Sequence, residues 1–176
     1  SKKFMDINDF INSLEIKLFI KLNYIGDLDR AFQLAHKTNQ FNFTTNRYSK
    51  NEIEDMIADD QIDVLTCRVN DRFGDYGTTV LLIVFKDGLK WKIDTFLMSC
   101  RVLGKQVENA VLNWYLTNCY NGKTLEAYYK PTMKNKQLEN KYEELGFTVT
   151  SRSASSVNYK LDTINKFNLS IEVNSE

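Results

Sequence analysis

The chain has 176 residues, of which 43% are hydrophobic and 12% aromatic, which is enough to bury the core of one domain. Lys and Arg total 23, as do Asp and Glu, so no net positive charge attracts nucleic acid or an anionic membrane, although the balance leaves room for a local basic patch. No apolar run reaches the roughly 18 residues that span a bilayer, and the start lacks the apolar centre of a secretion signal.

Hydrophobic periodicity predicts the helices and strands. In chain order we expect a helix at 4–13, a strand at 15–22, a helix from 28, a helix from 50 to about 59, strands at 63–70, 78–86 and 90–98, a helix at 105–119, a strand at 124–129, a helix at 135–145 and strands at 147–152 and 156–162. Asp27 is a candidate cap of its helix, while Ser49 and Glu52 form a capping-box pattern. Asp87-Gly88 marks a tight hairpin, and Gly146 is an expected left-handed cap.

This order of elements predicts an α+β fold. Adjacent hairpins in the middle of the chain exclude a doubly wound parallel sheet. The single proline and the absence of repeats favour one continuous domain. The cysteines Cys67, Cys100 and Cys119 are odd in number and not closely paired, which favours free thiols in a reducing, cytoplasmic compartment and no metal site.

The stretch MSCRVLGKQVENAV, residues 98–111, joins a buried strand to a helix. The first amides of that helix are free to bind an anion such as phosphate. Gly104 lets an oxygen approach the backbone, and Arg101 and Lys105 add positive charge. The alternative is an ordinary strand-to-helix turn with a surface arginine.

Two segments resemble the GNAT acyltransferase superfamily. Its acyl-CoA loop is matched by Arg101 and Gly104 but not by Gln106, and a later motif is matched by Asn135, Tyr142 and Gly146-Phe147, with Lys141 in place of an aromatic residue. The resemblance implies a mixed, mostly antiparallel sheet with helices on both faces. It also implies a cofactor, phosphopantetheine or coenzyme A, that pairs with the strand end around Phe96 to Met98 and lies on the loop Arg101 to Gln106 and beside Asn135.

A narrower resemblance rests on TNQFNFTTNRY (38–48), NDRFGDYG (70–77), WKIDTFLMSCRVLGKQVE (91–108) and YKPTMKN, which together resemble the C-terminal half of FkbH-like proteins. That family joins a haloacid-dehalogenase-type (HAD-type) phosphatase region to a GNAT-like region. The resemblance implies transfer of a three-carbon glyceryl unit to the phosphopantetheine thiol of an acyl carrier protein, for polyketide-type biosynthesis.

The phosphatase half of that family needs an Asp-x-Asp-x-Thr/Val loop, which this sequence lacks. We therefore expect the phosphatase to be a domain or partner outside these residues. The expected division is a linker helix at 1–14 that follows a missing HAD-type domain, the GNAT-like domain at 15–165 and a frayed tail at 166–176.

Four side chains are candidates for chemistry. Cys100, beside the arginine of the loop, is a candidate acyl-accepting nucleophile, or else an inert buried cysteine. Tyr142 resembles the superfamily's tyrosine that protonates the departing thiolate, or else is a core residue. His36, the single histidine, is a candidate base or a partner of its helix end, and Asp94 in mid-strand is a base, an orienting group or one half of an ion pair.

The polar loop at 38–48 is a candidate binding site for the acyl group. Its expected substrate-binding residues are Asn39, Gln40, Asn42, Thr44 and Arg47. The alternative is a loop that bonds to itself and is anchored by its aromatic residues. Asp71 and Asp75 fit turn chemistry.

Three functions therefore stay open. The domain is an acyltransferase of an FkbH-like protein, a non-catalytic module that docks the carrier protein for a phosphatase, or a conventional N-acyltransferase that uses acyl-CoA.

Overall fold

The computed structural model describes residues 6–165 and 170–175. Its helices are α1 (Ile7–Ser13), α2 (Leu28–Lys37), α3 (Lys50–Ala58), α4 (Val107–Asn118) and α5 (Lys141–Glu144), with short 3-10 helices η2 (Ile25–Asp27), η3 (Cys100–Val102) and η4 (Lys136–Leu138). Its strands are β1 (Lys17–Leu22), β2 (Phe41–Asn42), β3 (Ile62–Asp71), β4 (Gly74–Asp87), β5 (Lys90–Met98), β6 (Thr124–Tyr129), β7 (Phe147–Arg152), β8 (Val157–Leu161) and β9 (Glu172–Ser175).

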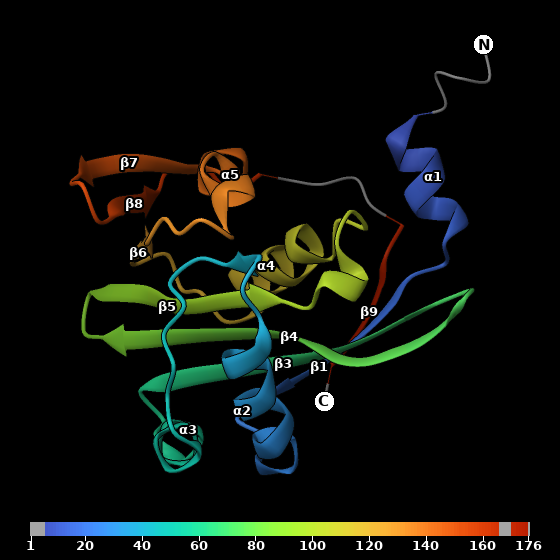
Figure 1. Cartoon of the computed structure of the whole chain (residues 1–176), viewed down its shortest axis with the longest axis horizontal. Helices are drawn as coiled ribbons and strands as arrows, with labels where there is room; N and C mark the ends of the chain where they lie inside the picture. Colours follow the sequence, from blue (N-terminus) through green and yellow to red (C-terminus); the bar gives the residue numbers. More distant parts are fainter. Residues whose placement is uncertain (1–5, 166–169, 176) are drawn as a thin grey trace.

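One mixed sheet forms the centre of the molecule (Figure 1). Its strand order is β7-β8-β6-β5-β4-β3-β1-β9, and β2 pairs with β5 away from this path. The β5/β6 and β1/β9 pairs are parallel, and the other pairs are antiparallel. The predicted α+β fold with a mostly antiparallel sheet is confirmed.

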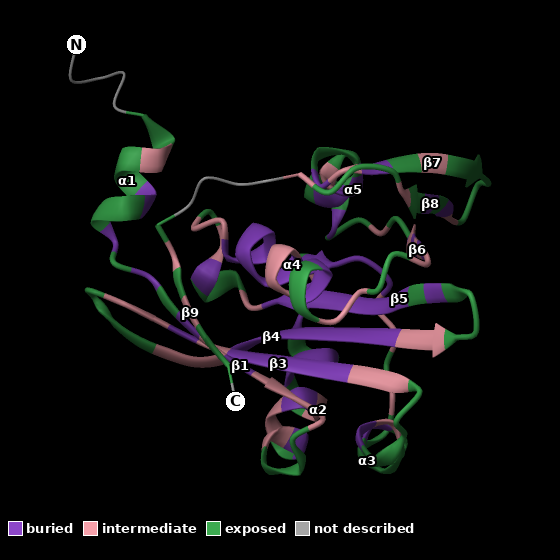
Figure 2. Cartoon of the chain, turned by 180° about the vertical axis from the view of Figure 1, so that it is seen from behind, coloured by how far each residue is buried: buried purple, intermediate pink, exposed green. Residues whose placement is uncertain are grey.

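Helices cover both faces of the sheet, as the resemblance implies. Figures 1 and 2 show α2 and α3 together on one side and α4 and α5 on the other. Side chains alternate along the strands, so Leu81 and Ile83 pack with α2 and α3 while Leu82 and Val84 pack in the core that includes α4. This burial on both faces explains the long apolar run in β4.

Several local predictions are confirmed by the structure. Ser49 and Glu52 form a capping box at α3, with both reciprocal hydrogen bonds present. Asp87 pairs with Lys90 across a two-residue turn, as the Asp-Gly signal predicts. These features depend on residues that are close together in the sequence.

Three expectations about elements were wrong. Asp27 stands at the N-cap position of α2, but its side chain makes no cap bond and instead accepts the hydroxyl hydrogen of Thr66 at 2.7 Å. The helix expected at 135–145 is two pieces, η4 and α5, separated around Asn140, a residue type that disfavours helix interiors. Residues 172–175 of the expected tail form β9, which pairs with β1, while 166–169 and 176 lie outside the described residues.

Candidate functional site

A pocket of about 750 Å³ opens at the C-terminal end of β5. Helix α2, the segment after it and the loop after β6 surround this pocket. Its lining residues are Arg30, Leu34, Lys37, Thr38, Asn39, Gln40, Phe41, Met98, Ser99, Cys100, Met133 and Lys134. We call it the Cys100 pocket. Its volume is typical of sites that hold a small ligand.

The Cys100 pocket brings together residues that the sequence assigned to separate tasks. Cys100 is exposed, whereas Cys67 is buried and Cys119 is half-buried. Strand β5 ends at Met98, and the following 3-10 helix carries Cys100 out of the sheet. Asn39 and Gln40, predicted to bind the acyl group, line the same pocket.

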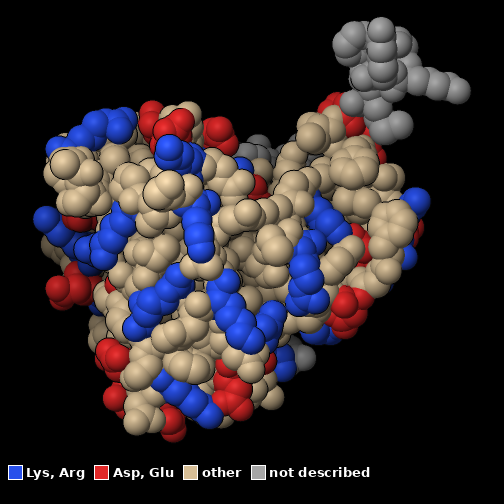
Figure 3. Space-filling model, viewed as in Figure 1, with Lys and Arg blue, Asp and Glu red and all other residues tan. Residues whose placement is uncertain are grey.

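Positive side chains dominate the charge of this pocket. Arg30, Lys37 and Lys134 line it, and no Asp or Glu does. Within the described part of the chain, none of the three forms an ion pair. Figure 3 shows Lys and Arg side chains gathered across the face that carries α2. The neutral chain thus has the local basic patch that its composition left open.

The parallel pair β5/β6 separates in its second half. Residues pair from Lys90 and Thr124 as far as Ile93 and Ala127, and no further. Beyond that point β2 occupies the space, because Phe41 pairs with Met98 and the amide of Phe43 donates to the carbonyl of Phe96 at 3.3 Å. The Lys130 amide then donates to the carbonyl of Phe43 at 2.8 Å. The chain's own residues therefore bridge the parted strands.

Asn135 holds the segment at 41–43 and the loop after β6 together through hydrogen bonds. Its side-chain amide donates to the carbonyl of Asn42 at 2.9 Å and to that of Lys130 at 3.0 Å. Its side-chain oxygen accepts the Thr132 amide at 2.7 Å and the Tyr129 hydroxyl at 3.3 Å. Since the Asn135 residue has no exposed surface, these bonds lie away from water. The residue predicted to lie beside a cofactor binds the chain itself.

The turn between β5 and α4 has the backbone geometry of an anion cradle. Gly104 has a φ of 76°, and no atom lies within 4 Å of the position of an added Cβ. Gln106, which precedes α4, also has a positive φ, of 59°. Among the described residues, no side chain accepts a hydrogen bond from the amides of residues 104–109.

The two cations predicted for this cradle are bound elsewhere. Lys105 donates to the carboxylate of Asp71 at 2.6 Å and to the hydroxyl of Tyr76 at 2.7 Å. The Arg101 guanidinium donates to the carbonyl of Tyr76 at 2.7 Å. In the first turn of α4, the buried carboxylate of Glu108 lies 2.7 Å from the Lys141 ammonium. A carboxylate at this helix end already complements the helix dipole.

The Asp71–Lys105 pair predicts a pH-dependent stability. Burial raises the pKa of the Asp71 carboxyl, but the hydrogen bonds from Lys105 and from the Phe73 amide outweigh burial, and the net pKa is lowered. Because the folded pKa lies below the unfolded value of about 3.9, this stabilisation is present above that pH and is lost as the pH falls through the folded pKa.

We therefore expect Asp71→Asn to lower the free energy of unfolding at pH 7 and to differ less from the parent chain at pH 3. Urea denaturation at both pH values measures this. Asp60→Asn is the control, since exposed Asp60 forms no hydrogen bond or ion pair with another described residue. A deficit that is equally large at both pH values would contradict the argument.

Comparison with known proteins gives a likeness of fold. No family model matches the sequence, and no curated protein matches it either. Among solved structures, the ribosomal-protein-S18-alanine N-acetyltransferase of Escherichia coli has a TM-score of 0.62 at 12% identity, covering 86% of this chain and 97% of its own. The PaiA N-acetyltransferase of Thermoplasma acidophilum in complex with coenzyme A has a TM-score of 0.60 at 16% identity, covering 82% and 99%.

A third match names the superfamily. It is a GNAT-family acetyltransferase structure from Desulfovibrio desulfuricans, with a TM-score of 0.63 at 10% identity, covering 82% of this chain and 98% of its own. The chain has the GNAT fold. The GNAT-like resemblance of residues 101–106 and 129–147 is thereby supported at the level of the fold.

The GNAT-like resemblance implies that the end of β5 is open and pairs with a cofactor. In this structure that end of β5 is already paired with the chain itself. Phe96 and Met98, expected to pair with a cofactor arm, are buried and pair with the segment at 41–43. An arm would pair with this edge of β5 only if that segment moved away. No sequence pattern predicts β2, because a two-residue strand has no periodicity of its own.

Tyr142 lies beneath the same segment. Its ring stacks on Phe43 with centroids 4.0 Å apart, and its hydroxyl is buried without a hydrogen-bond partner in the described structure. Burial raises the pKa of Tyr142 well above its ordinary value, so the hydroxyl stays protonated. The hydroxyl is closed off from solvent and does not line the Cys100 pocket.

Asp94 is buried at the centre of a second polar network. Its carboxylate accepts the hydroxyl hydrogens of Tyr48 at 2.8 Å and of Thr95 at 2.9 Å. Asn46 donates to the hydroxyl of Tyr128 at 2.9 Å. Burial, followed by the bond to Asp94, raises the pKa of Tyr48. The predicted mid-strand carboxylate thus has neutral hydrogen-bond partners and no ion pair among the described residues.

Other predicted residues hold the loop together. Asn42 and Thr44 are buried, and Thr44 donates to the carbonyl of Asp94 at 2.9 Å. Arg47 donates to the carbonyl of Ala35 and, at 3.2 Å, to that of Thr38, so it caps the end of α2. His36 contacts the carbonyl of Tyr48 through Nε2 at 2.8 Å and does not line the Cys100 pocket.

The sequence analysis did not predict the positively charged residues of the Cys100 pocket or the hydrogen-bond partners of Asp94. Arg30 and Lys37 lie seven residues apart on α2, with Leu34 between them, so helical spacing could have placed them on one face. The network of Asn46, Tyr48 and Tyr128 had no such local signal, because its members come from a loop and from β6.

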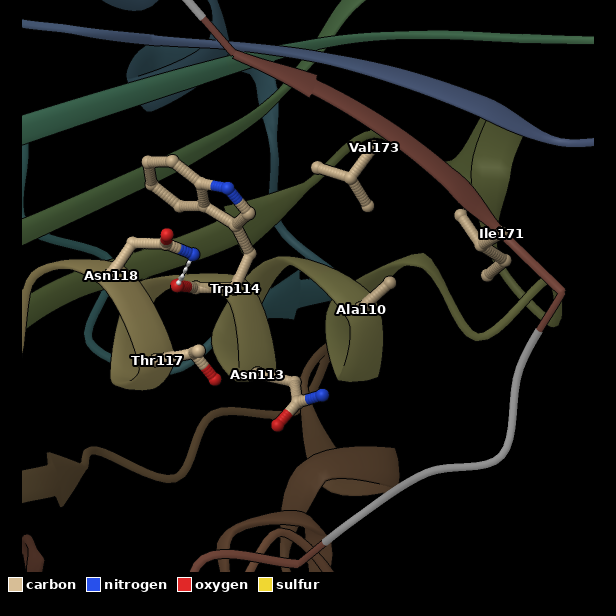
Figure 4. A pocket seen from close by; sticks show the side chains of 7 residues that line it. All are labelled: Ala110, Asn113, Trp114, Thr117, Asn118, Ile171 and Val173. Carbon is tan, nitrogen blue, oxygen red and sulfur yellow. Dashed lines mark hydrogen bonds between the residues drawn. The ribbon is translucent and has the colours of Figure 1, made fainter.

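A second pocket, of about 240 Å³, lies between α4 and β9 (Figure 4). Trp114 and Val173 line it from opposite sides. It contains none of the predicted residues and no charged side chain. Among the described residues, no group of three or more His, Cys, Asp or Glu side chains is arranged to hold a metal ion. The described helices are too short or too polar to cross a membrane.

Proposed function

We propose that this domain transfers an acyl group to a thiol and that Cys100 carries the acyl group between donor and acceptor. The observation behind this proposal is the exposed Cys100 thiol in a pocket that also contains Asn39 and Gln40. A cysteine reached by solvent can act as a nucleophile, while nearby amides can hydrogen-bond a small polar acyl group.

The reaction consists of two exchanges at one carbonyl carbon. In the first, the Cys100 sulfur forms a bond to the carbonyl carbon of the donor, the bond to the donor's leaving group breaks, and the proton of the Cys100 thiol passes to that leaving group. In the second, the acceptor sulfur attacks the same carbon, the bond to Cys100 breaks, and the proton of the acceptor thiol passes to the Cys100 sulfur. No oxidant or reductant is needed, and the cysteine is regenerated.

We further propose that the acyl group is a glyceryl unit and the acceptor the phosphopantetheine thiol of an acyl carrier protein, as in FkbH-like proteins. The motifs at 38–48 and 91–108 support this, and both contribute to the Cys100 pocket. The HAD-type phosphatase that this reaction requires would act from another domain or another chain. The carrier-bound phosphopantetheine, which we call the tether, is a substrate in this reaction and not a resident cofactor.

The tether reaches Cys100 through the mouth of the pocket in this proposal. The route along β5 is filled by Phe41 and Asn42, and Tyr142 is enclosed behind Phe43. Tyr142 therefore has no part in the reaction by this route. The neighbouring turn contains Arg101, Gly104, Lys105 and Gln106. Its backbone, with positive φ at Gly104 and Gln106, suits a phosphate of the carrier-bound arm.

Replacing Cys100 by alanine tests the proposal. In a reaction reconstituted with an FkbH-type phosphatase, a glyceryl donor and a carrier protein, Cys100→Ala should reduce glyceryl transfer at least about 100-fold, because the covalent route is removed. Intact-protein mass spectrometry of the loaded carrier measures transfer, and a glyceryl adduct on Cys100 should appear when the carrier is omitted. Cys119→Ala is the matched control and should transfer normally.

Unchanged transfer by Cys100→Ala would support the alternative, a docking module that presents the carrier protein to a phosphatase. The closed seam and the enclosed Tyr142 are the observations that favour this alternative. The further candidate, an N-acyltransferase that uses free acyl-CoA, rests on the fold shared with N-acetyltransferases. Calorimetry that shows tight acetyl-CoA binding and no response to a carrier protein would favour that candidate.

A further inference from the structure

We infer that the Cys100 pocket is a binding site for a phosphate group, held by Arg30, Lys37 and Lys134, and that the ligand of Cys100 therefore enters with a phosphate attached. This inference deepens the proposed function and rests on it only in taking Cys100 as the reacting group. The phosphate-binding residues are separate from the turn at 101–106, where the resemblance places the phosphates of a cofactor.

Helix α2 supplies two of these cations on one face. Arg30 and Lys37 are seven residues apart, about two turns or roughly 10 Å along the helix axis. Leu34 lies between them and lines the same pocket. An elongated ligand can thus contact both charges while its apolar part lies on Leu34, Phe41 and Met98, which also line the pocket.

The charge of Arg30 is held in place without being neutralised. Its Nε donates to the carbonyl of Thr78 at 2.9 Å, and the neighbouring Arg101 donates to the carbonyl of Tyr76. Both acceptors are neutral carbonyls of β4. Burial and the nearby Arg101 charge both lower the pKa of Arg30. The Arg30 guanidinium therefore keeps its charge for an anion in the pocket.

The third cation comes from the other wall of the pocket. Lys134 follows Met133 in the loop after β6, and its ammonium forms no hydrogen bond or ion pair with another described residue. Lys37 likewise has no such partner. Lysines bind phosphate as point charges, and five guanidinium donors allow Arg30 to add directed hydrogen bonds. A neutral acyl group would need none of this charge.

The experiment measures how ligands protect Cys100 from alkylation. The full chain is treated with iodoacetamide at rising concentrations of glycerol 3-phosphate or of glycerol, and the Cys100 peptide is quantified by mass spectrometry. We expect saturable protection by glycerol 3-phosphate and none by glycerol at the same concentrations, because the two differ only in the phosphate. Added salt should weaken the protection.

Charge-removing variants identify the residues that hold the phosphate. Lys37→Ala and Lys134→Ala should each raise the apparent Kd about 10-fold, since each loses a charged contact to phosphate. Lys136→Ala is the matched control, because this exposed lysine lies two residues from Lys134 but outside the pocket lining. Its Kd should stay within about twofold of the parent value. Equal thermal unfolding midpoints would show that the variants fold.

The source of the phosphate is resolved by a second pair of probes, phosphopantetheine and pantetheine. Protection by phosphopantetheine alone assigns the phosphate to the thiol tether, and protection by glycerol 3-phosphate assigns it to the acyl donor. Either result supports the inference. The inference would be overturned if neither phosphorylated probe protected Cys100 better than its unphosphorylated partner, or if the Kd were unchanged in both lysine variants.

Calorimetry measures the binding of inorganic phosphate to the Cys100→Ser protein. This measurement tests the phosphate site independently of the proposed function. Binding in that protein that is lost in the Lys37→Ala variant supports the phosphate site even where Cys100 proves to have no part in transfer. Absence of phosphate binding to the Cys100→Ser protein, together with normal acyl transfer by the parent chain and by Lys37→Ala, would reject the site and leave the proposed function standing.

Discussion

Replacement of Phe43 by alanine is expected to lower the free energy of unfolding by about 3–5 kcal/mol, as large-to-small changes of buried aromatic residues do. Phe43 has no exposed surface, and its ring contacts Phe41, Phe96 and Tyr142. The substitution leaves a cavity in this aromatic cluster, directly over the Tyr142 ring. Urea denaturation monitored by circular dichroism measures the loss.

Phe73→Ala is the matched control for this prediction. Phe73 is 68% exposed in the turn between β3 and β4, so its removal should change the free energy of unfolding by less than about 0.5 kcal/mol. A loss below about 1 kcal/mol for Phe43→Ala would show that the segment at 41–44 is loosely held. In that case the seam between β5 and β6 would be open to a ligand, contrary to the geometry described above.

Substitution of Asn135 by aspartate should be the second large effect, with about 3 kcal/mol or more lost in the free energy of unfolding. Aspartate keeps the oxygen that accepts the Thr132 amide but removes the two donor hydrogens that reach the carbonyls of Asn42 and Lys130. Those carbonyls would then face an oxygen in a site without water. The change isolates the donor bonds, because the volume of the side chain is nearly unchanged.

Hydrogen exchange gives this prediction a local readout. The amides of Phe43 and Lys130 bond across the bridged seam, so they should exchange faster in Asn135→Asp than in the parent chain. Asn140→Asp is the control, since exposed Asn140 makes no side-chain cap bond at α5. Unaltered exchange at Phe43 in Asn135→Asp would mean that Asn135 is not what holds the segment in the seam.

The segment at 41–43, which bridges β5 and β6, is where this structure departs from the arrangement that the GNAT-like resemblance implies. The GNAT-like resemblance predicts that a cofactor arm lies between the separated ends of β5 and β6. Here Phe41 and Asn42 take that position, and Asn135, aligned with the family's motif, secures them. The chemistry that we propose lies instead at the end of β5, where exposed Cys100 lines a basic pocket.

Much of the fold was predictable because its signals are local. The capping box of Ser49 and Glu52, the Asp87-Gly88 turn and the apolar runs of β4 and β5 involve residues within a few positions of one another. Periodicity then gave the order of elements, and that order gave the α+β class. Cys100, Asn39 and Gln40 could be predicted as site candidates because Cys100 adjoins Arg101 at the end of a predicted strand and the two amides lie in a polar loop between predicted helices.

Other features depended on contacts between distant parts of the chain. The sequence by itself determined most of the helices and strands, the position of Cys100 just after the strand at 90–98, and the polar loop that precedes α3. Only the tertiary structure decided that Phe41 and Asn42 pair with Met98 and Leu97, that residues 172–175 join β1, and that cations from α2 and from the loop after β6 surround Cys100. Such pairings form between residues tens of positions apart, and their stability comes from burial and hydrogen bonds that no local pattern encodes.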